Sequence, residues 1–123
     1  NTEIKDYWKL LYPYIKEAIE PILYNQFFFK GWKITNYWFQ QYEKTDEHTW
    51  HFHGSSMYNF VYYVEKPDGC PSTEMIIPIT GQIIQPKVEE GQILVFPSIM
   101  RHRSPPNPSD GRKTIIAFNL DVK

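Results

Sequence analysis

The stretch Trp50-His51-Phe52-His53 alternates aromatic rings with imidazoles. A period of two residues is typical of a β-strand, whose successive side chains point to opposite faces. We therefore expect Trp50 and Phe52 to pack beneath helices and both histidines to lie on the inner face of a barrel. A buried imidazole needs a hydrogen bond or a metal ion to replace its lost hydration. Taken alone, the pair fits two hydrogen-bonded core histidines as well as it fits a metal site.

The segments around this stretch predict a mainly β fold. Seven β-prone segments are separated by turn residues, at 32–41, 49–53, 58–64, 75–77, 82–85, 92–96 and 112–120. No helical pattern follows residue 31. Short strands with proline and glycine between them favour a β-sandwich or barrel.

The N-terminal part, about residues 2–24, has helical spacing instead. Its apolar side chains are Ile4, Trp8, Leu11, Ile15, Ile19 and Leu23. Pro13 and Pro21 each lack a backbone donor, so we expect two short helices or a kinked one, with Pro13 near the start of the second. Such an amphipathic segment is expected to cover one sheet.

Size and charge limit the function classes. The 123 residues predict a single domain over 1–123. Thirteen basic and 14 acidic residues give a net charge of -1, which disfavours nucleic acid and anionic membranes as partners. Cys70 is the only cysteine, so no internal disulfide can form, and a cytoplasmic protein is expected. No signal peptide or run long enough to cross a bilayer is visible.

A second candidate cluster lies downstream. His102 is followed ten residues later by Arg112 and then by Thr114. One face of the predicted last strand carries Arg112, Thr114, Ile116, Phe118 and Leu120, and we expect this face to be buried. An arginine buried beside a hydroxyl needs an anion such as a carboxylate. The alternative is an Arg112 paired with Asp110 or another acid of the protein.

Several of these motifs, in this order, resemble the double-stranded β-helix (jelly-roll, cupin-like) oxygenases that use Fe(II) and 2-oxoglutarate, particularly the prolyl-4-hydroxylase-like branch. The likeness covers about the C-terminal two-thirds of the chain. Its elements are Tyr42-Glu43-Lys44-Thr45-Asp46 nine residues before His51, Val61-Tyr62-Tyr63-Val64, Gly91-Gln92-Ile93-Leu94-Val95-Phe96, His102, and Arg112-Lys113-Thr114.

The resemblance implies a site and an activity. His51, His53 and His102 would bind the metal, while Arg112, Thr114 and Tyr42 would hold the far carboxylate of 2-oxoglutarate. The expected enzyme is a dioxygenase that hydroxylates an unknown small-molecule or peptide substrate and releases succinate and CO2. The alternatives are a non-catalytic jelly-roll that has lost turnover and a cupin-like metal protein that works without 2-oxoglutarate.

One residue departs from the family pattern, which is His-x-Asp or His-x-Glu. His53 stands where the carboxylate belongs. Three neutral imidazoles suit Zn, Ni or Cu as well as Fe. The other ligand sets are His51 and His102 with Asp46 or Glu47, or a two-histidine site completed by water or halide.

Overall fold

The computed structural model describes residues 4–123. Its contacts divide the chain into two compact units, one comprising residues up to Trp32 together with Val122 and Lys123, the other comprising Lys33–Asp121. The expected single domain over 1–123 stays a prediction.

The first unit is helical, as the spacing predicts. Helix α1 spans Asp6–Pro21 and continues into a π-helical turn, η1, at Ile22–Gln26. Its buried side chains are Trp8, Ile15, Ile19 and Leu23. No helix in the described part of the chain is long and apolar enough to cross a membrane.

The expected division at Pro13 is wrong, because α1 runs through this residue as one helix. A proline inside a helix removes a single backbone hydrogen bond, to the carbonyl four residues earlier. Here that carbonyl belongs to the exposed Lys9, where water can solvate it. The buried apolar stripe on both sides of Pro13 therefore keeps the helix continuous.

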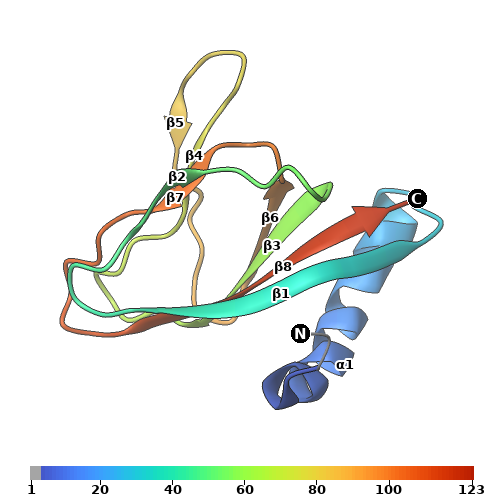
Figure 1. Cartoon of the computed structure of the whole chain (residues 1–123), viewed down its shortest axis with the longest axis horizontal. Helices are drawn as coiled ribbons and strands as arrows, with labels where there is room; N and C mark the ends of the chain where they lie inside the picture. Colours follow the sequence, from blue (N-terminus) through green and yellow to red (C-terminus); the bar gives the residue numbers. More distant parts are fainter. Residues whose placement is uncertain (1–3) are drawn as a thin grey trace. The chain divides into compact units, whose positions relative to one another are not determined.

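The second unit contains two four-stranded sheets (Figure 1). The strands are β1 Trp32–Tyr42, β2 His48–His51, β3 Tyr58–Glu65, β4 Glu74–Ile76, β5 Ile83–Ile84, β6 Ile93–Pro97, β7 His102–Ser104 and β8 Lys113–Val122. The orders are β1-β8-β3-β6 and β2-β7-β4-β5. Strand pairing is antiparallel at β3–β6, β3–β8, β2–β7, β4–β5 and β4–β7. This interleaving of distant strands confirms the mainly β, jelly-roll fold.

All seven expected segments contain a strand, whereas β7 was not expected. Three residues, two of them charged or hydroxylated, are too few to show a period. The expected aromatic face of the second segment is also wrong: Phe52 is 53% exposed, and the Arg101 guanidinium lies over its ring. The reason is that β2 ends at His51, so the alternation does not continue to Phe52.

The core of the second unit determines which side chains reach the site. It consists of Tyr42, Val61, Tyr63, Met75, Val88, Phe96, Ile115 and Ala117, drawn from both sheets. The odd-numbered residues of β3 and β8 therefore point inward. Phe60 and Phe118 stack on the opposite face of the same sheet, with ring centroids 4.9 Å apart. Any functional group on these two strands must follow this parity to reach the interior.

Candidate metal centre and carboxylate pocket

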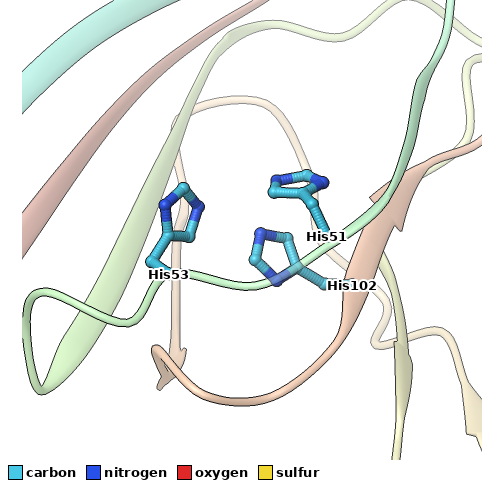
Figure 2. Close-up of side chains that lie close together, drawn as sticks. All are labelled: His51, His53 and His102. Carbon is cyan, nitrogen blue, oxygen red and sulfur yellow. The ribbon is translucent and has the colours of Figure 1, made fainter.

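The three expected metal ligands meet at one place. His51 ends β2, His102 begins β7, and the two residues are partners in the β2–β7 register. His53 follows in the next loop, where its backbone N–H donates to the Ser98 carbonyl at 2.8 Å. One ligand atom from each of the three imidazoles lies within 4.8 Å of the other two, and Figure 2 shows the rings gathered together.

Hydrogen bonds to the backbone fix two of these imidazoles. The Nδ1 atom of His51 lies 2.6 Å from the Thr49 carbonyl oxygen, and the Nδ1 atom of His102 lies 2.9 Å from the Met100 carbonyl oxygen. A carbonyl only accepts, so Nδ1 carries the hydrogen in both rings. The Nε2 lone pairs of His51 and His102 are consequently available to a metal, which is the usual arrangement around metal-binding histidines.

The third imidazole gives an independent indication of a metal. His53 Nε2 is buried without a hydrogen-bond partner among residues 4–123. A buried polar atom left unsatisfied costs about 1–3 kcal/mol. A metal ion shared with the other two histidines would satisfy it. These residues therefore fit a transition metal such as Fe or Zn, for which imidazole is a suitable ligand.

Burial keeps His53 and His102 neutral. It is the largest cause that lowers the pKa of both residues, the neighbouring imidazoles add to it, and the pKa of His102 falls to about 4. The hydrogen bond from His102 to Met100 opposes this decrease without cancelling it. At neutral pH the lone pairs are therefore not blocked by protons.

His48 packs against the cluster without joining it. A register shift between His48 and His51 in the β2–β7 pairing brings His48 to the pocket side, contrary to the simple parity of the strand. Its ring stacks on His51, with centroids 3.8 Å apart and planes inclined by 15°. Two stacked rings hold their nitrogen lone pairs in nearly parallel planes, so they do not converge on one ion. His48 therefore packs against His51 and is not a ligand of the same ion.

The acidic alternatives are absent from the histidine group, which contains no carboxylate among the described residues. Asp46 lies in an exposed turn, where its Oδ2 accepts the Glu43 backbone N–H at 2.9 Å. Glu47 precedes β2 and is exposed. His53 thus occupies the third position in space as well as in sequence.

A pocket that is open to solvent extends from the histidines to the start of β8. Lys113 lines its far end with only 1% of its surface exposed. Its Nζ donates to Ser104 Oγ at 2.7 Å and to the Pro71 carbonyl at 3.0 Å. No carboxylate in the described part of the chain forms an ion pair with Lys113. A buried ammonium without a counter-ion is costly, and a bound anion would offset that cost, so Lys113 is a candidate anion-binding residue.

Arg112 lies outside this pocket, although most of its face of β8 is buried as expected: Thr114, Phe118 and Leu120 are at most 8% exposed. The Arg112 side chain is half exposed, and its Nε donates to Glu65 Oε1 at 2.7 Å. Thr114 donates a short hydrogen bond to the same Glu65 oxygen. The alternative of an arginine paired with a protein acid is correct, with Glu65 as the acid, because Asp110 pairs with Lys44 at 3.1 Å.

Tyr42 lies in the pocket, as expected. Its ring centre is 4.6 Å from Lys113 Nζ, and its hydroxyl donates to Gln40 Oε1 at 2.8 Å. Burial raises the pKa of Tyr42 to about 12, so the phenol stays protonated and can donate a hydrogen bond. Together, Tyr42, Ser104 and Lys113 give this end of the pocket the character of a carboxylate site.

Two further residues line the pocket wall: Tyr63, which belongs to the motif Val61-Tyr62-Tyr63-Val64, and Thr73, which sequence reasoning missed. Tyr63 is 1% exposed. Its hydroxyl oxygen accepts the Thr73 backbone N–H at 3.0 Å and lies 2.6 Å from Thr73 Oγ1. This pairing fixes the position of the phenol between the two sheets. The alternation of β3 indicates Tyr63, whereas no local signal marks Thr73.

Comparison with known proteins identifies the family. Residues 36–119 match the family model described as "Putative 2OG-Fe(II) oxygenase". An oxidoreductase of the 2OG-Fe(II) oxygenase family from Burkholderia pseudomallei is similar in structure, with a TM-score of 0.76 and 12% identity over 92% of this chain and 57% of the other. The chain thus spans little more than half of that protein. The search of curated proteins found no match.

Two prolyl hydroxylases have the same fold. The Pseudomonas putida prolyl-4-hydroxylase gives a TM-score of 0.67 at 13% identity, over 100% of this chain and 69% of the other. The viral collagen prolyl hydroxylase of Paramecium Bursaria Chlorella virus-1, in its 2OG complex, gives a TM-score of 0.66 at 14% identity, over 98% of this chain and 78% of the other. At such identities the likeness shows the fold alone. Since the family model covers well over half of the sequence, the chain belongs to the 2OG-Fe(II) oxygenase family.

Proposed function

We propose that this protein is a 2-oxoglutarate-dependent dioxygenase that binds Fe(II) through His51, His53 and His102. Its primary substrate is a small molecule or a peptide that is hydroxylated with release of succinate and CO2. One observation carries the proposal: among the described residues, three convergent imidazoles and a buried ammonium without a counter-ion line the same pocket. This combination matches a co-substrate with a metal-binding end and a free carboxylate at the other.

In this proposal Lys113 replaces Arg112 as the group that holds the far carboxylate of 2-oxoglutarate. The ammonium provides the charge, the Ser104 hydroxyl lies beside it as a further hydrogen-bonding group, and the Tyr42 ring packs against it. A charge-assisted hydrogen bond in a buried pocket is stronger than a neutral one. Binding the carboxylate here would also neutralise the buried charge.

The histidines and their backbone partners would prepare the other end. The Thr49 and Met100 carbonyls hold two imidazoles in the metal-binding tautomer. Fe(II) bound at this site would supply dioxygen activation coupled to oxidative decarboxylation of 2-oxoglutarate. The protein's own contribution is positioning: it would orient the co-substrate between Lys113 and the histidines and limit the access of water.

The third histidine is compatible with this role on charge grounds. Three neutral ligands leave the full 2+ charge on the metal, whereas a carboxylate would reduce it. The dianionic co-substrate would then compensate that charge. The site is consequently expected to bind 2-oxoglutarate more strongly once the metal is present.

The test is succinate release from 2-oxoglutarate under air with added Fe(II), together with co-substrate affinity. The Lys113→Met variant should lose at least tenfold in affinity for 2-oxoglutarate, since a hydrogen bond to a charged group contributes about 1.5–3 kcal/mol. Arg112→Gln is the matched control, and it should change the affinity less than twofold because Arg112 faces Glu65 instead of the pocket. Equal losses in both variants would contradict the assignment.

A second candidate function is a metal-binding jelly-roll that does not turn over 2-oxoglutarate. The observation in its favour is the lack of a carboxylate in the histidine group of the described residues. This alternative predicts metal binding without succinate production and without any effect of 2-oxoglutarate on the bound metal's spectrum. A dioxygenase would instead release succinate, and 2-oxoglutarate would change the spectrum of its bound metal.

A further inference from the structure

Three buried side chains in the described part of the chain contain a polar atom without a hydrogen-bond partner. Among residues 4–123, the buried side-chain nitrogen and oxygen atoms without a partner are His53 Nε2, Asn59 Oδ1 and Asn119 Oδ1. Asn59 on β3 and Asn119 on β8 are register partners, and they are 2% and 3% exposed. A metal accounts for the histidine atom but not for the two carboxamides. Of these, only Asn59 lines the pocket.

The Asn59 amide lies next to a metal ligand. Its Nδ2 is 3.4 Å from His102 Nε2, and within residues 4–123 this long contact is the one hydrogen bond of the Asn59 side chain. The direction of the bond follows from the tautomer of His102: Nδ1 donates to Met100, so Nε2 holds a lone pair. The amide therefore presents its N–H2 group to the ring, and the oxygen is left without a donor.

This hydrogen bond competes with metal binding. The Nε2 lone pair that accepts from Asn59 is the lone pair that a metal would use. When a metal takes it, the amide N–H2 loses its acceptor in a place where bulk water cannot replace it. A buried donor needs a new acceptor to avoid the cost of desolvation.

We propose that Asn59 is a positioning residue whose amide donates a hydrogen bond to a carboxylate oxygen of 2-oxoglutarate once His102 holds the metal. The inference rests on the proposed function. The Asn59 amide would then donate to the carboxylate instead of to His102 Nε2, and it would orient the end of the co-substrate that lies at the metal. Lys113 would hold the far end, so the two residues divide the task between the ends of the pocket.

The experiment uses the full chain loaded with Co²⁺, whose visible absorption reports its coordination. The Asn59→Leu variant keeps a branched side chain but removes both amide atoms. Co²⁺ affinity should be unchanged or higher in this variant, because nothing competes for the His102 lone pair. Affinity of the Co²⁺-loaded protein for 2-oxoglutarate should fall about tenfold, and the spectral change on adding 2-oxoglutarate should differ from that of the wild type.

Asn119→Leu is the matched control, since it removes an equally buried carboxamide that does not line the pocket. It should leave both affinities within twofold of the wild type. Asn59→Ala and Asn119→Ala provide a second pair if the larger side chain prevents folding. Equal 2-oxoglutarate affinities in wild type and the Asn59 variants, or a parallel loss of Co²⁺ affinity and melting temperature, would overturn the inference. A wild-type protein that binds Co²⁺ but not 2-oxoglutarate would instead refute the proposed function on which it rests.

Discussion

At the scale of single residues, Lys113 combines burial with a charge that nothing in the described chain neutralises. The pKa of Lys113 is lowered from its ordinary value of 10.5 to about 8, mainly by burial; Cys70 opposes this decrease and the nearby Lys66 adds to it. Because the unfolded chain holds this proton up to a higher pH, the contribution of Lys113 to folding stability should increase as pH rises between about 8 and 10.5.

The same shift predicts how co-substrate binding depends on pH. The affinity for 2-oxoglutarate should fall as pH rises through about 8, since the ammonium that would hold the carboxylate loses its proton. Tyr42 does not contribute, because its pKa is about 12. The measurement is a calorimetric titration across this range. In Lys113→Arg the decline should move to higher pH, since arginine stays charged; an identical profile would show that Lys113 does not bind the anion.

The convergence of His51, His53 and His102 was predictable from the sequence, because side-chain type and spacing indicate it. The direction of the side chains was not predictable at Arg112 and Lys113, which are adjacent cations. Both faces of the strand that follows them are largely buried. Apolar alternation therefore could not show that Lys113 lines the pocket while Arg112 faces Glu65.

At the scale of elements, the connection between β7 and β8 depends on Asn107, which is fully buried. Its Nδ2 donates to the Tyr42 carbonyl at 3.1 Å and to the Gly111 carbonyl at 2.8 Å. Its Oδ1 accepts from the Ser109 backbone N–H at 2.9 Å. One side chain thus links the end of β1 to the loop before β8 and fixes the direction in which Lys113 enters the pocket.

Asn107→Ala should consequently destabilise the protein by about 2–4 kcal/mol, since several buried groups lose their partners together. Urea unfolding is the measurement. Asn36→Ala is the control: the Asn36 side chain accepts an exposed backbone N–H from Tyr37, and its removal should cost less than about 0.5 kcal/mol. A loss of similar size in both variants would contradict this account of the loop.

Elements differ in how far a sequence can reveal them. The long strands β1, β3 and β8 have enough residues to show a period and a preference for β-branched or aromatic side chains. β7 has only three residues and exists because it pairs with β2 and β4. The contact between Asn59 and His102 could not be predicted either, because it joins distant segments and leaves no local sequence pattern.

At the scale of the whole molecule, metal binding should raise the stability of the chain. A ligand present at 100 times its dissociation constant stabilises the folded state by about 2.7 kcal/mol. For a chain of this length that corresponds to a rise in melting temperature of roughly 10 °C. Calorimetry with added Zn²⁺ should show the rise, EDTA should reverse it, and His53→Ala should weaken it. An unchanged melting temperature would show that the histidines do not form a metal site.

The position of the histidines has a consequence for local motion. β2 lies at the border of its sheet, and its only neighbour there is β7. A metal held by His51 and His102 would cross-link β2 to β7 and oppose the separation of the two strands. Backbone amides of β2 should then exchange with deuterium more slowly after metal loading, while those of β3, flanked by strands on both sides, should keep their rate. Loss of the metal would leave a loosened strand whose unpaired edge is available to another chain.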